Sequence, residues 1–199
     1  MDVAILLGAR VLANVTATGD INGVAAAKRS CSSDRQYGPH RWGPWILATD
    51  GGVDVPKSAG VGILLSSLNS SEIIEKASIN CGARPCSYRT ESRALLLALE
   101  KLMIPRNQYR RKTLFVVTDS QSLLAALNKG PLSQTDWTED QIWQRLLTLT
   151  CAGWSVHLQF CYGHCGVHAN ELADQYATQT MESGHTTEHG IAPYGIRIC

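Results

Sequence analysis

The fold class follows from one stretch of the sequence, residues 112–130, which reads KTLFVVTDSQSLLAALNKG. Its first part is a continuous run of β-forming apolar residues, typical of a strand that is buried on both faces of a sheet. Its second part predicts a short helix, and Gly130 follows where that helix would end. A doubly buried strand that passes directly into a helix predicts an α/β domain.

Further strands and helices are predicted on both sides of this stretch. Before it we expect strands over residues 45–52, 59–67 and 72–80, then a helix over 90–103 that Pro105 ends. After it we expect a helix that begins near residue 137, a strand over 154–160 and a last helix over 170–180. The helix near residue 137 offers Thr138 and Gln141 as a capping box, with Trp137 and Ile142 as its hydrophobic staple. The order βββαβααβα predicts a mixed five-stranded sheet, three leading antiparallel strands and then parallel strands, flanked by helices.

Length, composition and charge limit the possible functions. The chain has 199 residues, of which 44% are hydrophobic, enough for one domain with its own core. The net charge of +1 provides no strong overall field that would attract nucleic acid or acidic lipid, so any charged site must be local. We expect a poorly structured arm over residues 1–44, the domain over 45–181 and a tail over 182–199.

Cysteine content and hydropathy indicate the compartment. The seven cysteines are odd in number and scattered, which favours reduced thiols in an intracellular protein of the nucleus or cytoplasm. A mitochondrial location stays open, because Arg10, Lys28 and Arg29 are basic, although Asp2 and Asp20 argue against a presequence. The apolar start of the chain is too short to cross a bilayer, so we expect no membrane partner.

Four carboxylates lie where carboxylates are energetically costly. Asp50 and Asp119 end predicted apolar strands, at the edge where α/β sheets bind their ligands. Glu91 continues the apolar face of one predicted helix, and Asp174 lies on a helix face lined by alanines. Crowded buried carboxylates repel one another, and hard oxygen ligands suit Mg²⁺. Two such ions about 4 Å apart can hold the attacking and leaving oxygens of a phosphodiester displacement. Taken singly, Asp119 could instead cap the next helix, and Glu91 could complement a helix dipole.

Four motifs in this order resemble the type I ribonuclease H family, and most of all the ribonuclease H domains of non-LTR retrotransposons. They are TDGGV (49–53), YRTESRALLLALE (88–100), VVTDSQSLLAAL (116–127) and GHCGVHANELADQYA (163–177). The resemblance covers about residues 45–180 and implies the ribonuclease H-like fold. It implies an endoribonuclease that cleaves the RNA strand of RNA–DNA hybrids with two Mg²⁺ or Mn²⁺ ions. Besides the hybrid, it implies a reverse transcriptase or another nucleic-acid-binding domain as partner, and we expect a monomeric domain.

The resemblance also assigns roles to residues. Its four catalytic, metal-binding carboxylates fall on Asp50, Glu91, Asp119 and Asp174. Asp50 would bridge the two ions, with Glu91 and Asp119 on the first and Asp174 on the second. His164 matches a mobile histidine that helps to protonate or release the product. The predicted contacts with the hybrid are Gly51, Gly52, Arg84, Cys86, Ser87 and Tyr88.

The chain departs from the family pattern at positions that are expected to contact nucleic acid. The first motif reads Asp-Gly-Gly where Asp-Gly-Ser is common. Cys86 stands where a threonine often helps to bind a DNA phosphate. The segment GPLSQTDWTED (130–140) is short and acidic where some members carry a basic protrusion. We therefore expect fewer phosphate contacts than in those members.

The sequence is also compatible with two functions other than a nuclease. Cys161, His164, Cys165 and His168 have spacings that suggest zinc, but the adjacent His164 and Cys165 would rarely reach one ion in tetrahedral geometry. We therefore interpret Cys161 as a small core residue and His164 as the proton-handling residue. A zinc-stabilised interaction module is the weaker alternative. A non-catalytic nucleic-acid-binding or scaffold subunit is the stronger one, although a scaffold has no chemical need for four acids and a histidine.

Overall fold

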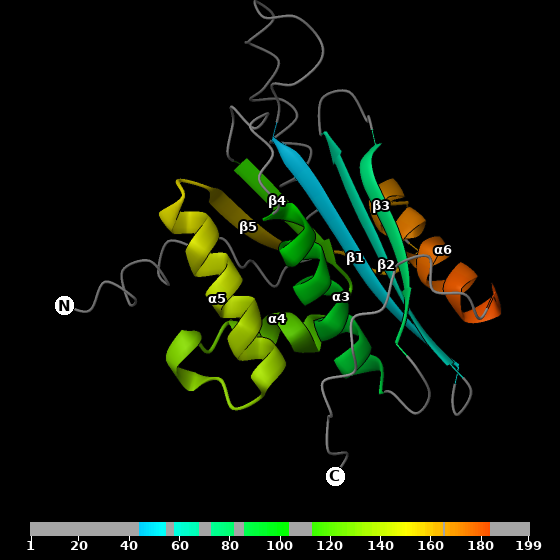
Figure 1. Ribbon diagram of the computed structural model, residues 1–199, viewed down its shortest axis with the longest axis horizontal. Coiled ribbons are helices and arrows are strands. Elements are labelled where there is room, and N and C mark those ends of the chain that lie inside the picture. Colours follow the sequence, from blue (N-terminus) through cyan, green and yellow to red (C-terminus); the bar gives the residue numbers. More distant parts are fainter. Residues whose placement is uncertain are drawn as a thin grey trace, which may run out of the picture.

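A computed structural model describes residues 44–54, 58–67, 73–81, 86–103, 113–164 and 166–183. They form one five-stranded sheet in the order β3-β2-β1-β4-β5, with helices on both faces (Figure 1). Strands β1 (Trp45–Asp54), β2 (Ser58–Ser67) and β3 (Ile73–Asn80) are antiparallel neighbours. Strands β4 (Thr113–Thr118) and β5 (Ser155–Phe160) run parallel to β1. The predicted mixed sheet and its element order are confirmed.

The helices match the predicted ones, with two corrections at their starts. They are α3 (Ser87–Leu102), α4 (Gln121–Leu127), α5 (Trp137–Cys151) and α6 (His168–Ser183), with a 3-10 turn η2 at Pro131–Ser133. Helix α3 begins at Ser87, earlier than the apolar spacing indicated, because its first turn is largely solvent-exposed and carries no apolar signal.

The predicted capping box of α5 is wrong. Asp136 is the N-cap, and its carboxylate accepts a hydrogen bond of 2.7 Å from the backbone N–H of Thr138. An aspartate is a strong acceptor at this position and satisfies a backbone donor without a reciprocal partner. Trp137 is 59% exposed, so it does not form the predicted hydrophobic staple with Ile142.

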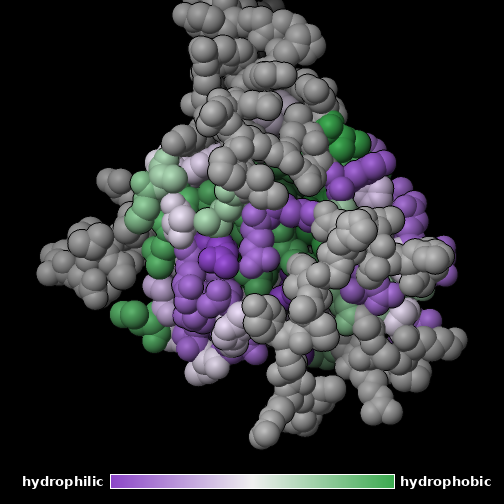
Figure 2. Space-filling model, viewed as in Figure 1, coloured by the Kyte–Doolittle hydropathy of each residue, from purple (hydrophilic) through white to green (hydrophobic). Residues whose placement is uncertain are grey.

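Two apolar cores of unequal size hold the layers together. The larger core lies between the sheet and helices α3, α4 and α5, and includes Leu95, Leu99, Val116 and Trp143. Hydrophilic side chains cover much of the outer surface of α5 (Figure 2). Its buried residues Ile142, Trp143 and Leu146 belong to the larger core. The smaller core lies under α6. No helix in the described part of the chain is both long and apolar enough to cross a membrane.

Helix α6 packs unusually close to the sheet because the strands carry glycines beneath it. A Cβ at Gly62 would overlap the backbone carbonyl oxygen of Ala173, and one at Gly60 would overlap that of Ala177. Gly62 is also the direct partner of Asp50 in the β1–β2 ladder. The close approach therefore brings the start of α6 next to Asp50, and the residue after Ala173 is Asp174.

Candidate active site

The site opens where two parallel strands stop pairing. The register of β1 with β4 ends at the pair Ala48–Val117. Asp50, inside β1, and Asp119, directly after β4, each follow two residues later, so both carboxylates lie where the parallel pairing ends, a place where crevices form in α/β proteins. Glu91 reaches the same place from α3. Ligand oxygens of these three carboxylates all lie within 4.8 Å of one another.

A glycine allows α3 to deliver Glu91 to this point. A Cβ at Gly51 would lie 2.6 Å from the backbone nitrogen of Glu91 and equally close to the carbonyl carbon of Thr90. Any side chain at position 51 would push α3 away from β1. Gly51 therefore sets the distance between Asp50 on the strand and Glu91 on the helix.

The carboxylates are crowded and poorly hydrated. Burial, and then the charges of Asp119 and Asp174, raise the pKa of Asp50 to about 7. Burial, and then Asp50 and Asp119, raise the pKa of Glu91 to about 9. The pKa of Asp119 is also raised, mainly by burial. Unless a cation neutralises the cluster, these carboxyl groups therefore favour their protonated, uncharged form.

Asp174 and His164 form the outer side of the site. Asp174 lies on α6, and its charge is one of those that raise the pKa of Asp50. It stands outside the tight group of three, and its side chain is 37% exposed. His164 has an 82% exposed side chain, and its Nδ1 lies 3.9 Å from Oδ2 of Asp174. His164 also has a left-handed backbone, with φ 55°, and follows Gly163 on an exposed turn.

Sequence reasoning missed two residues that touch Asp119. Asn170, 3% exposed, donates a side-chain hydrogen bond to the Asp119 carboxylate, which favours its charged form. A Cβ at Gly163 would lie 2.9 Å from Oδ2 of Asp119, so the backbone of the β5–α6 connection runs directly against that oxygen. The signal for Asn170 was its spacing four residues before Asp174, which puts both on one helix face. No comparable signal marked Gly163.

The residues present fit a divalent cation. One oxygen of Glu91, Oε2, is buried and has no hydrogen-bond partner. An unpaired buried carboxylate oxygen costs free energy unless a proton or a cation satisfies it. Hard oxygen donors of this kind suit Mg²⁺ or Mn²⁺. Asp50, Glu91 and Asp119 are therefore the residues best placed to hold such an ion.

The single-residue alternatives for these acids do not hold. Helix α4 has Ser120 at its N-cap and no side-chain cap, so Asp119 does not cap it. The first turn of α3 contains no acidic residue, and Glu91 lies beyond it, so Glu91 does not complement the helix dipole. Both acids belong instead to the carboxylate cluster.

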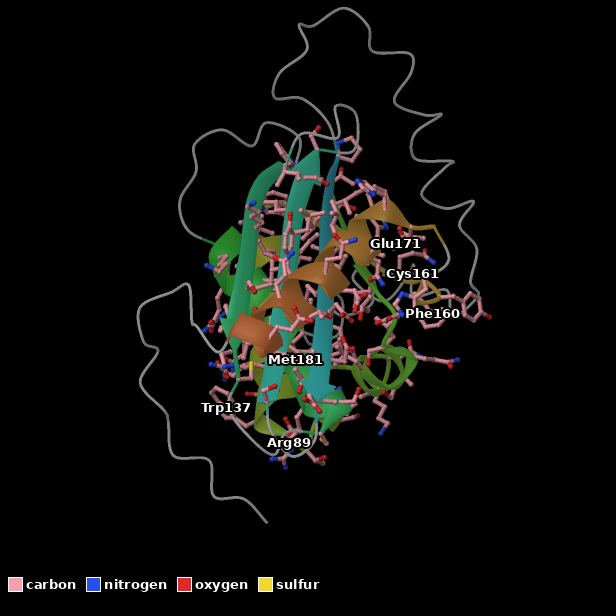
Figure 3. The ribbon with its side chains drawn as sticks, turned by 90° about the vertical axis from the view of Figure 1, so that its right-hand side faces the viewer. Arg89, Trp137, Phe160, Cys161, Glu171 and Met181 are labelled. Carbon is pink, nitrogen blue, oxygen red and sulfur yellow. The ribbon has the colours of Figure 1, made fainter. Side chains whose placement is uncertain are left out.

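The predicted hybrid contacts that the structure describes lie at the start of α3 and on β1. Cys86 and Ser87 are exposed at its start. Tyr88 is half-buried and donates its hydroxyl hydrogen to Oε1 of Glu139 on α5. Gly52 packs against Met181, which Figure 3 places at the far end of α6. Arg84 lies outside the described residues. None of these contacts with nucleic acid is tested by the geometry, and they stay predictions.

The zinc alternative finds no support in the described residues. Cys161 is 4% exposed and packs in the smaller core with Ala48, Val117 and Ala173. His164 points into solvent on the turn that follows. Cys165 lies outside the described residues, and the group of metal-binding side chains found in the remainder is the carboxylate cluster.

Comparison with protein families gives one match. The model of the RNase H (ribonuclease H) family matches residues 44–182, which is more than two thirds of the chain. No curated protein matches this chain.

Solved structures of similar shape come from several sources. Ribonuclease H1 of the halophilic archaeon Halobacterium salinarum NRC-1 is 21% identical, with a TM-score of 0.52, over 71% of this chain and 99% of that one. LC11-RNase H1, isolated from compost by a metagenomic approach, is 19% identical, with a TM-score of 0.55, over 71% of this chain and 97% of that one. The same enzyme in complex with an RNA/DNA hybrid is 18% identical, with a TM-score of 0.52, over 69% and 99%. At these identities the likeness shows the ribonuclease H-like fold.

Proposed function

Since the chain belongs to the ribonuclease H family, whose members cleave the RNA strand of RNA–DNA hybrids, we propose that it does so with two divalent ions held by its four carboxylates. The observation that carries the proposal is the group of Asp50, Glu91 and Asp119, whose oxygens lie within 4.8 Å of one another. A scaffold would gain nothing from a buried cluster of acids, because such a cluster destabilises the fold unless it binds a cation.

Each residue has a definite task in this reaction. Asp50, Glu91 and Asp119 would hold one ion, and Asp174, beside Asp50, would help to hold the other. Asn170 keeps Asp119 oriented and favours its charged form. Ions held by these residues would supply positive charge that offsets the charge developing on the scissile phosphate.

His164 is the group best suited to proton handling. It lies on an exposed turn within 3.9 Å of Asp174, so it can turn toward the reacting phosphate or into solvent. Proton transfer by a positioned side chain typically contributes roughly 10²–10⁴-fold to a rate. We propose that His164 assists departure of the 3′-hydroxyl product while the ions carry the main electrostatic stabilisation.

Incubation with end-labelled RNA–DNA hybrid in Mg²⁺, Mn²⁺ or EDTA tests this function. The parent protein should cut the RNA strand of the hybrid in the presence of metal, and should leave single-stranded RNA and duplex DNA intact. Asp119→Asn should lose nearly all cleavage, because an amide is a poor ligand for a hard cation. Cleavage by this variant at the parent rate would refute the site.

We also propose a retrotransposon origin and a reverse transcriptase as neighbour. Support comes only from the resemblance of the four sequence motifs to domains of that kind. Sequencing the transcript on both sides of this coding region tests it. A continuous reading frame for a reverse transcriptase would support the proposal, and an unrelated neighbour would refute it.

A further inference from the structure

Tyr162 is an exposed aromatic side chain at the rim of the carboxylate site. Large apolar side chains that are exposed in the described part of the chain are few: Ile73, Leu132, Trp137 and Tyr162. Tyr162 is 58% exposed and immediately precedes Gly163, whose backbone runs against Asp119. Of these four side chains, Tyr162 is the one beside the carboxylate cluster.

The backbone around Tyr162 is fixed to the site from both sides. Before it, the N–H of Cys161 donates a 3.0 Å hydrogen bond to the carbonyl oxygen of Thr118, the residue before Asp119. After it, the N–H of Gly166 donates a 2.9 Å hydrogen bond to Oε1 of Glu171 on α6. Tyr162 is thus held where β4, β5 and α6 converge on the carboxylates.

The ring itself is held without being buried. It packs edge-on against Phe160, with ring centroids 5.1 Å apart and an interplanar angle of 78°. Phe160 is 9% exposed and belongs to the larger core, so it offers a firm support. A contact with Phe160 reduces the side-chain freedom that Tyr162 would lose on binding a ligand. An aromatic ring that is supported in this way and still exposes much of its surface can bind a ligand at a low cost in side-chain entropy.

The chemistry of the site identifies that ligand, on the basis of the function proposed above. The carboxylates receive the scissile phosphate, so the strand next to Tyr162 is the RNA strand. Bases of a duplex are stacked on one another, which leaves the sugars and phosphates as the accessible surface. The chain has a net charge of only +1, so contacts other than ion pairs must supply more of the affinity.

We propose that Tyr162 binds the RNA strand beside the scissile phosphate, with its ring packed against a ribose. It is a substrate-binding residue and not part of the carboxylate machinery. Its contribution should therefore appear in affinity for the hybrid more than in the rate of the bound complex.

Binding is measured in an Asp119→Asn background with labelled hybrid, and KM and kcat are measured in the active protein. Tyr162→Ala should raise Kd and KM by roughly 5- to 100-fold, the range of aromatic contacts with nucleic acid, and change kcat by less than about threefold. Tyr162→Phe keeps the ring and should stay within about threefold of the parent. Leu132→Ala removes a similarly exposed apolar side chain elsewhere and should bind like the parent.

Thermal unfolding separates a binding role from a structural one. Because Tyr162 is 58% exposed, Tyr162→Ala should unfold within a few degrees of the parent. Parent-like binding by Tyr162→Ala, or Tyr162→Phe as weak as Tyr162→Ala, would overturn the proposed ring contact. A weaker Kd accompanied by a large fall in melting temperature would overturn it as well. If the parent neither binds nor cuts the hybrid, the proposed function itself fails, which is a distinct result.

Discussion

Replacing Asp50 with asparagine should stabilise the metal-free protein while it abolishes cleavage. Asp50 is 6% exposed, and its carboxyl faces the charges of Asp119 and Asp174. The unfolded chain has no such crowding. At neutral pH the folded state therefore suffers a cost for Asp50 that an uncharged side chain of the same shape avoids.

The size of the effect follows from the pKa. Each pKa unit corresponds to about 1.4 kcal/mol. The rise of the Asp50 pKa from 3.8 to about 7 thus corresponds to roughly 4 kcal/mol of destabilisation above pH 7. A buried amide still loses its own hydration, at about 1–3 kcal/mol. We expect a net gain of about 2 kcal/mol for Asp50→Asn, or roughly 5–10 °C in melting temperature for a domain of this size.

The sign of the pH dependence gives a second measurement. A carboxyl whose folded-state pKa is raised favours the folded state at low pH, where both states are protonated. That advantage is lost as pH rises from about 3.8, where the unfolded chain ionises, to about 7, where the folded chain does. The stability of the parent in EDTA should fall through this window and continue to fall to about pH 9, because the pKa of Glu91 is raised to about 9, and Asp50→Asn should fall less.

Denaturant unfolding in EDTA and in Mg²⁺ provides the assay. Asp54→Asn is the matched control, because Asp54 is an exposed carboxylate at the end of the same strand and should have no effect. Ligand at 100 times its Kd adds about 2.7 kcal/mol to the stability of a protein that binds it, so Mg²⁺ should cancel or reverse the advantage of Asp50→Asn. A variant that is equally stable or less stable than the parent in EDTA would refute the crowding argument.

Three further predictions concern other parts of the site. His164→Ala should slow turnover by roughly 10²–10⁴-fold without abolishing it, in single-turnover assays, and a loss as deep as that of a carboxylate variant would indicate a ligating role. Gly62→Ala should cost about 3 kcal/mol or more in denaturant unfolding, because its Cβ would overlap the carbonyl of Ala173, whereas Gly52→Ala meets only the flexible end of Met181 and should cost about 1 kcal/mol; equal costs would contradict the close approach of α6. Affinity of a catalytically inactive variant for hybrid should be weak, with Kd on the order of 10⁻⁶–10⁻⁴ M at physiological salt and a shallow salt slope, and nanomolar binding with a steep slope would reveal a basic surface elsewhere.

Local patterns in the sequence determined the order of the elements and the identity of the acids. An apolar run followed by aspartate predicts a strand end with a carboxylate, and this holds for Asp119, which directly follows β4. It is wrong for Asp50, because β1 continues through Gly51 and Gly52 to Asp54, paired with β2. Helix boundaries were less accurate. The start of α3 has no apolar periodicity, and the cap of α5 depended on which of several polar residues reached a backbone donor. Periodicity reports which side of an element is buried, but it does not report which exposed side chain forms a cap.

Only the tertiary structure decided how near the acids lie and what surrounds them. Three features that bring the acids together each involve segments far apart in the chain. They are the end of the β1–β4 pairing, the contact of Gly51 with α3, and the hydrogen bond from Asn170 to Asp119. The position of Tyr162 beside the site likewise depends on where β5 and α6 meet. Residue type and spacing fix the character of each strand and helix, because hydrogen bonds within a helix are local and the alternation of side chains along a strand is set by its own backbone. Distances between elements depend instead on how backbones and side chains fit across the sheet, and in this protein glycines set the closest of those distances.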